Sequence, residues 1–128
     1  MIKLLKFQEG VAEVLNKHFA EKNIFVGDGI PSDAPKPYIF LGDVETTSDG
    51  TKTSDLSNTT INIIPFTNNN GKAECLGLCD EIVSVLTGGF EIEGEYVIDA
   101  EITSIQVRET SDVEIVGQVS LRVSSQNE

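Results

Sequence analysis

The end of the chain carries an alternation of apolar and polar side chains, and no other feature restricts the fold as strongly. Within residues 113–123, apolar side chains recur at alternate positions, namely Val113, Ile115, Val119, Leu121 and Val123. The positions between them hold Glu114, Gln118, Ser120 and Arg122. A repeat of two residues is typical of a β-strand with one buried face. A second such segment at residues 95–107 precedes it, and the short polar connection between the two predicts an antiparallel hairpin.

Two other segments have the repeat of an amphipathic helix. Residues 2–21 place apolar or aromatic side chains three to four positions apart, at Leu4, Phe7, Val11, Val14 and His18. Residues 71–87 do the same with Leu76, Cys79, Ile82, Val83 and Leu86, and Gly88 and Gly89 follow as a helix terminator. Gly10 weakens the first helix, so a close contact with another segment is expected there.

Three shorter apolar runs predict further strands, at residues 24–26, 38–42 and 59–66. Three prolines exclude a helix or a central strand from the loop at residues 27–37. Tyr38 and Phe40 are expected to pack beneath the helices. Pro65 predicts that its strand is an edge strand or ends there.

Residues 43–58 are almost wholly polar and contain an Asp49-Gly50 turn signal. Because two strands flank them, they predict a long hairpin whose tip stands away from the domain, although a simple loop explains the composition as well. The chain as a whole predicts one α+β domain over residues 1–128. We expect a mostly antiparallel sheet of about four to five strands, with two helices packed on one face.

The net charge excludes two classes of function. The chain has 9 Lys and Arg against 21 Asp and Glu, a formal charge of −12, and residues 42–128 carry the whole excess. General or sequence-specific nucleic-acid binding requires basic side chains, as does docking on an anionic membrane, so neither is expected. Lys3 and Lys6 interrupt the apolar start, so no signal-peptide core is expected, and no run is long enough to span a membrane.

The residues with catalytic or metal-binding chemistry are few. His18 is the single histidine, and a lone histidine at the end of an apolar stripe favours packing over catalysis or metal binding. Cys75 and Cys79 are four residues apart on a helix, farther than a disulfide allows, and are expected to be reduced core residues. No phosphate-loop, dinucleotide or hydrolase motif is present. The sequence therefore predicts no enzyme, no cofactor and no metal site.

One acidic cluster leaves three interpretations open: Glu91, Glu93, Glu95, Asp99 and Glu101. Paired carboxylates can act as acid and base or hold Ca²⁺. A solvated charged face is the simpler interpretation, since no calcium-loop pattern is present. The third possibility is that these acids face a passage for another polyanion and repel it.

Residues 34–42 read Ala-Pro-Lys-Pro-Tyr-Ile-Phe-Leu-Gly. Their Pro35, Pro37, Tyr38 and Gly42 resemble a segment of the small tail-completion proteins of long-tailed bacteriophages and prophages. The order of helices, strands and polar hairpin is also similar over nearly the whole chain. The resemblance implies a structural virion protein that ends the tail tube and joins it to the head.

The resemblance also implies partners. Proteins similar to this one assemble, usually as a hexameric ring, on the tail tube protein and meet the head-tail connector protein, first in the host cytoplasm and then in the virion. The polar hairpin is then expected to reach a neighbouring subunit through Thr46, Thr47, Asp49, Gly50, Lys52 and Thr53. In the ring, the acidic cluster is expected to line the DNA passage and to repel phosphate.

Three other functions remain open from the sequence. A neck or head-completion protein would share the same residues. An acidic inhibitor that mimics DNA and blocks a host DNA-binding protein would share the charge of −12. A small enzyme would require a concave pocket around the acidic cluster.

Overall fold

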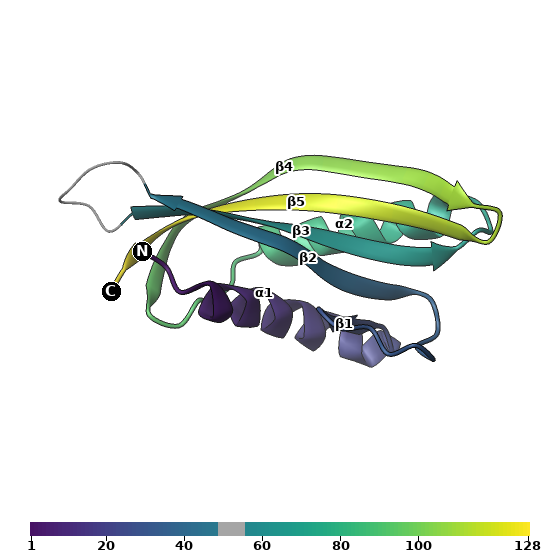
Figure 1. The fold of residues 1–128 in the computed structure, drawn as a ribbon, viewed down its shortest axis with the longest axis horizontal. Coiled ribbons are helices and arrows are strands. Elements are labelled where there is room, and N and C mark those ends of the chain that lie inside the picture. The colour runs from purple at the N-terminus through teal and green to yellow at the C-terminus, as the bar shows by residue number, and fades with distance from the viewer. Residues whose placement is uncertain (49–55) are drawn as a thin grey trace.

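The computed structural model describes residues 1–48 and 56–128 (Figure 1). The elements follow in the order α1 (Leu4–Phe19), the 3-10 helix η1 (Ala20–Lys22), β1 (Phe25–Gly27), β2 (Tyr38–Ser48), β3 (Leu56–Asn68), α2 (Ala73–Thr87), β4 (Glu95–Ser111) and β5 (Glu114–Asn127). Among these residues, no helix is long and apolar enough to cross a membrane.

The strands form a 5-stranded sheet in the order β1-β2-β3-β5-β4. The short β1 pairs with β2 in parallel, and the other three ladders are antiparallel. Helix α1 packs against β1 and β2, α2 packs against β3, β5 and β4, and the two helices also contact each other. Both therefore cover the same face of the sheet, and Figure 1 shows α1 along one margin and α2 behind the sheet. The predicted α+β architecture is confirmed.

Each helix buries one stripe, but not wholly the predicted one. In α1 the buried side chains are those of Phe7, Val11, Leu15 and Phe19. In α2 they are those of Cys75, Leu78, Cys79, Ile82 and Leu86. Leu76, predicted as core, is 48% exposed because it lies on the flank of the helix.

Strand alternation places two aromatic residues on the opposite face from the predicted one. Ile39 and Leu41 of β2 are buried in the core below the helices. Tyr38 and Phe40 alternate with them, so they point to the face that no helix covers among the described residues. The expectation that they pack beneath the helices was wrong, because the smaller aliphatic side chains take the inward positions.

The prediction from Pro65 was also wrong. β3 continues to Asn68 and is the middle strand of the sheet, with β2 on one side and β5 on the other. In the ladder between β3 and β5, the pair Ile63↔Val119 is followed by the pair Phe66↔Val116, and the two positions between them are not paired. The ladder is thus interrupted where proline has no N–H to donate.

The polar residues at both ends of the stretch 43–58 belong to the paired strands β2 and β3. β2 extends to Ser48, which pairs with Ser57 of β3, and Ser57 is buried. The hydroxyl of Ser57 accepts a 3.0 Å hydrogen bond from the backbone N–H of Ile2. Both chain termini lie at this end of the sheet (Figure 1).

Two glycines permit close packing between layers. A Cβ atom on Gly10 of α1 would lie 2.6 Å from the carbonyl oxygen of Glu91, so the predicted close contact is present. A Cβ atom on Gly117 of β5 would lie 2.8 Å from Cys79 Sγ and 3.0 Å from Cys75 Sγ. The absence of a side chain at Gly117 lets α2 sit directly on β5.

Replacing glycine by alanine should have opposite effects in the two helices. Gly77 lies in α2 with open space around its would-be Cβ, so Gly77→Ala should stabilise the fold by about 0.5–1 kcal/mol. Gly10→Ala should destabilise it by about 1–3 kcal/mol, because the added methyl overlaps the Glu91 carbonyl. Urea unfolding measures both. Equal stabilisation by the two substitutions would show that α1 does not contact residue 91 as described.

Candidate interaction surfaces

A cavity of about 630 Å³ opens between α1 and the segment that connects α2 to β4. Its lining includes six carboxylates and one lysine, contributed by Glu9, Glu13, Glu91, Glu93, Glu95, Glu128 and Lys6. Lys6 Nζ lies 3.0 Å from Glu93 Oε2 and 3.7 Å from Glu9 Oε2. The hydrogen bond to Glu93 raises the pKa of Lys6. One cation is thus shared between two acids, and the cavity keeps a negative surplus.

The predicted acidic cluster divides into two places. Glu91, Glu93 and Glu95 belong to the cavity, where a tight turn brings the backbone N–H of Glu95 to the carbonyl of Ile92. Glu91 and Glu93 are exposed, whereas Glu95 is 8% exposed and accepts a 2.9 Å hydrogen bond from the Ser125 hydroxyl.

The other two members of the cluster lie on β4. Asp99 pairs with Ser124, and Glu101 pairs with Arg122. The structure therefore does not gather all five carboxylates into one site.

The face of the sheet opposite the helices, here called the open face, carries an aromatic patch. The rings of Tyr38 and Phe66 stack with centroids 5.1 Å apart and planes at 24°. Phe40 pairs with Ile64 beside them, and all four side chains are only partly buried. A patch of this kind on a surface is typical of a contact site for another molecule.

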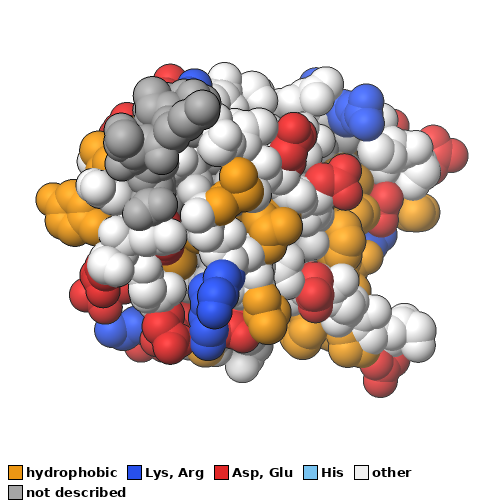
Figure 2. All heavy atoms as spheres, turned by 60° about the vertical axis from the view of Figure 1, so that its left-hand side comes forward, with side chains coloured by type: hydrophobic (Ala, Val, Ile, Leu, Met, Phe, Trp, Pro, Cys, Tyr) orange, Lys and Arg blue, Asp and Glu red, His pale blue; other side chains and the backbone are white. Residues whose placement is uncertain are grey.

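Polar side chains fill the remainder of the open face. Two serine hydroxyls of β5 donate to asparagine side chains of β3, at 2.8 Å for Ser120 to Asn62 and 2.8 Å for Ser124 to Asn58. Both arginines of the chain, Arg108 and Arg122, project from this part of the molecule at positions that alternate with the buried face. In the view of Figure 2, hydrophobic groups are interspersed with acidic and basic side chains.

The motif residues of the family resemblance lie in β2 and in the loop before it. Pro35 and Pro37 lie in the loop before β2, and the Lys36–Pro37 peptide bond is cis. Tyr38 begins β2 and contributes to the aromatic stack. Gly42 lies where the register of β2 on β3 shifts, and a Cβ atom there would be 3.1 Å from Ile64 Cδ1.

An ion pair ties the same loop to β5. Lys36 Nζ lies 2.9 Å from Glu114 Oε2, and both side chains are partly buried. This hydrogen bond is the main cause of the lowered pKa of Glu114, and the Thr110 hydroxyl adds a further hydrogen bond.

The predicted hairpin contacts fall partly on described residues. Thr46 and Thr47 lie in β2, opposite Thr59 and Asn58. The hydroxyls of Thr46 and Thr59 are 3.0 Å apart. Asp49, Gly50, Lys52 and Thr53 lie outside the described residues, so their predicted role at an interface stays a prediction.

The histidine and the cysteines occupy unremarkable positions. His18 is exposed, with its Nε2 3.8 Å from Glu81 Oε2, and Lys22 pairs with the other oxygen of the same carboxylate, Glu81 Oε1. Cys75 and Cys79 are free and buried, and burial raises the pKa of Cys79 to about 12. Both thiols are therefore protonated at neutral pH. Within the described parts of the chain, no three His, Cys, Asp or Glu side chains gather to hold a metal ion.

Sequence reasoning missed the aromatic patch because it assigned Tyr38 and Phe40 to the core. All four side chains at residues 38–41 are apolar, so the sequence pattern did not indicate that Ile39 and Leu41 occupy the buried face. It also missed the cavity, because Glu9 and Glu13 are far in sequence from the acids that they join.

The family model described as tail completion protein gp17 matches residues 1–124. Among solved structures, a chain of the "Virion of native gene transfer agent (GTA) particle" superposes with a TM-score of 0.81. The two chains are 16% identical, and the alignment covers 94% of each. No curated protein sequence matches.

Phe40 and Leu41 should differ in their importance for folding. Leu41→Ala should cost about 2–5 kcal/mol, because it opens a cavity in the core. Phe40→Ala should cost less, about 1–2 kcal/mol, because the ring is partly solvated on the open face. The free energies of unfolding of the two variants, measured in urea, show which of the two side chains lies on the buried face of the sheet. An equal or larger loss for Phe40→Ala would place that ring in the core.

The Lys36–Glu114 pair should contribute to stability at neutral pH and lose this contribution in acid. Because the folded-state pKa of Glu114 is below its ordinary value of 4.5, the contribution is complete above that value. It falls away as the pH drops through the folded-state pKa. Lys36→Met should lower the free energy of unfolding at pH 7 by less than about 1 kcal/mol. The free energy of unfolding should then fall less steeply between pH 7 and pH 3 than it does in the wild type.

The matched control is Lys17→Met, which removes the same charge from an exposed position on α1. Stability curves measured from pH 7 to pH 3 should keep the wild-type slope in this control. If Lys36→Met and Lys17→Met gave the same slope, the ion pair would not account for the acid sensitivity.

Proposed function

The chain belongs to the tail completion protein gp17 family, and from this membership we propose that it closes the head-proximal end of a phage tail tube and joins the tube to the head connector. We further propose that it does so as a hexameric ring. Its partners are then copies of itself, the tail tube protein and the head-tail connector protein. Its final location is the virion, after assembly in the host cytoplasm.

One observation carries this proposal: the family match extends over residues 1–124 and so includes every helix and strand almost in full. The more general conclusion, that the chain is a structural protein of phage tails, rests directly on this family match. The agreement in fold with a chain from a gene transfer agent virion supports the same conclusion.

The surfaces of the molecule suit assembly. Ring formation requires two different, complementary surfaces on each subunit. The open face offers partly buried aromatic side chains and both arginines, whereas the other side of the sheet presents the outer surfaces of α1 and α2. These surfaces differ in chemistry and lie on different sides of the sheet, which is compatible with head-to-tail contacts.

The net negative charge of the chain also has a role in this proposal. DNA that passes through a ring should not adhere to its wall, and carboxylates repel phosphate. We propose that the exposed members of the acidic cluster, Glu91, Glu93, Asp99 and Glu101, face the passage. Glu95 is a poor candidate because its carboxylate is buried against Ser125.

Fractionation of defective particles tests the proposal. A tail terminator should co-purify with headless tails, whereas a neck or head-completion protein should co-purify with tailless heads. Native mass spectrometry of the chain with the tube protein should then show about six copies on one ring. Recovery with tailless heads alone would overturn the terminator role.

An acidic inhibitor remains the second candidate, favoured only by the charge of −12. Affinity capture from a host lysate separates it from the first. The inhibitor should retrieve a host DNA-binding protein, and the terminator should retrieve tail tube protein.

Neutralising the proposed lumen acids should leave assembly intact and slow the release of DNA. The variant carries Glu91→Gln, Glu93→Gln, Asp99→Asn and Glu101→Gln, and DNA ejection from purified particles is measured in real time. The control variant neutralises four exposed acids elsewhere, Glu21, Asp33, Glu74 and Asp112. Unchanged ejection in the first variant, or equal slowing in both, would contradict a lumen position for the cluster.

A further inference from the structure

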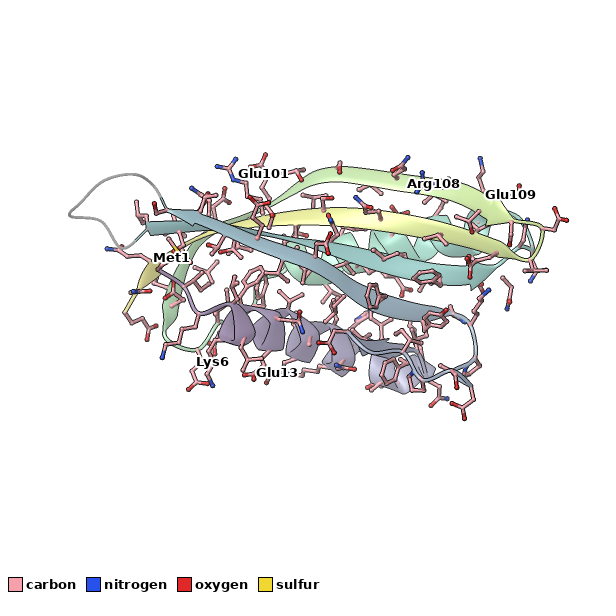
Figure 3. All side chains as sticks on the ribbon, in the orientation of Figure 1. Met1, Lys6, Glu13, Glu101, Arg108 and Glu109 are labelled. Atoms are coloured by element: carbon pink, nitrogen blue, oxygen red, sulfur yellow. The ribbon has the colours of Figure 1, made fainter. Side chains whose placement is uncertain are left out.

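The loop between β3 and α2 contains the one asparagine of the chain that a glycine follows, Asn70 before Gly71. At this end of the sheet, β3 leads into α2 and β4 turns back into β5 (Figure 1), and Figure 3 labels Glu109 close to it. Asn70 and Gly71 are both exposed. The side-chain carbonyl carbon of Asn70 and the backbone nitrogen of Gly71 can close a five-membered ring, so the two groups can react without a partner molecule.

Hydrogen bonds hold the residue before this pair. The backbone N–H of Asn69 donates to the carbonyl of Val113 at 3.1 Å, and its side-chain Nδ2 donates to the carbonyl of Ser111 at 3.1 Å. The side chain of Asn69 is thus tied to the β4–β5 turn. The nitrogen that would attack it is also occupied, since the backbone N–H of Asn70 donates to the carbonyl of Asn68 at 2.9 Å.

The corresponding groups of the next pair are free. Within the described parts of the chain, neither the side chain of Asn70 nor the backbone N–H of Gly71 makes a hydrogen bond. Gly71 has a φ of 95°, and a Cβ atom there would meet no atom within 4 Å. Glycine has no Cβ that hinders approach to its own nitrogen. An N–H without a hydrogen bond also loses its proton more readily than one that first has to give up a partner.

The start of α2 tolerates the negative charge that a reaction at Asn70 creates. α2 begins at Ala73, and Lys72 at its N-cap makes no side-chain hydrogen bond to the helix. The first turn contains one acid, Glu74. A carboxylate ahead of a helix interacts favourably with the unpaired N–H groups of its first turn. The charge change is therefore compatible with the fold.

We propose that Asn70 is a site of spontaneous deamidation in the folded protein. The backbone nitrogen of Gly71 loses its proton to hydroxide and attacks Cγ of Asn70, so a C–N bond forms and a succinimide ring closes. The C–N bond of the side-chain amide breaks, and ammonia leaves with a proton taken from water. Water then opens the ring: addition at the side-chain carbonyl gives aspartate, and addition at the backbone carbonyl gives isoaspartate. No oxidant or reductant takes part.

The products change this end of the molecule in two ways. Both add one negative charge to the loop. Isoaspartate also directs the main chain through the former side chain, which lengthens the connection between β3 and α2 by one methylene group. Because Asn69 stays tied to the β4–β5 turn, the added length falls between Asn69 and the start of α2. This inference goes beyond the proposed function and does not depend on it.

The test follows the full chain and a capped synthetic peptide with the sequence of residues 67–74 between pH 7 and pH 9. Mass spectrometry of peptide digests measures the conversion of amide to acid at each asparagine, and enzymatic methylation identifies isoaspartate. Asn70 in the folded chain should react within about threefold of its rate in the peptide, because no hydrogen bond has to be broken first. Asn69 in the folded chain should react at least about tenfold more slowly than Asn70. The rate at Asn70 should rise with hydroxide concentration.

Matched variants assign the reaction to this pair. Asn70→Gln keeps an amide at the position but requires a larger ring, so the conversion at residue 70 should fall at least about tenfold. Asn16→Gln makes the same change at an exposed residue of α1, and it should leave the conversion at Asn70 unchanged.

Three results would overturn the proposal: an intact amide at residue 70 of the folded chain under conditions in which the peptide reacts, equal conversion of Asn69 and Asn70, or a rate at Asn70 that does not change with pH. The first result would show that the folded loop holds the two reacting groups apart. Because the isolated chain is used, none of these results depends on whether the protein ends a tail tube.

Discussion

The packing of both helices on one face of the sheet is the constraint on which the rest of the structure depends. Gly117 permits it, because the absence of a Cβ lets the thiols of Cys75 and Cys79 rest directly on β5. With all of the large buried side chains on this side, the opposite face has no helix above it within the described residues. The open face is therefore a consequence of a one-sided core, and it is a surface through which a structural protein can meet its partners.

Much of this architecture was predictable because it is encoded in periodicity. The alternation from Ile115 to Val123 predicted a half-buried strand, and the spacing from Phe7 to Phe19 predicted the first helix. The errors arose where periodicity is ambiguous. In residues 38–41 every side chain is apolar, so the pattern did not show that Ile39 and Leu41 point inward while Tyr38 and Phe40 point outward. Pro65 was assigned to an edge because composition does not show that a central ladder is interrupted there.

The candidate surfaces were less predictable than the fold. Glu91, Glu93 and Glu95 were noticed as a cluster, but Glu9, Glu13 and Lys6 join them only through the contact of α1 with the segment before β4. Strand pairing, in contrast, carries Asp99 and Glu101 away from that cavity. The exposure of Ile105 and Leu76 depends on where α2 sits across the sheet, which no local pattern specifies. The excess of negative charge could be counted from the sequence. The sequence did not show that some of these acids line the cavity while others lie on β4.

Cryo-electron microscopy of the intact particle, with the tail-head junction reconstructed, tests the central claim most directly. The account predicts a ring of this fold between the last ring of the tail tube and the head connector, with each subunit fitted by α1, α2 and the 5-stranded sheet. Density for this fold elsewhere in the particle, or its absence from the junction, would contradict the account.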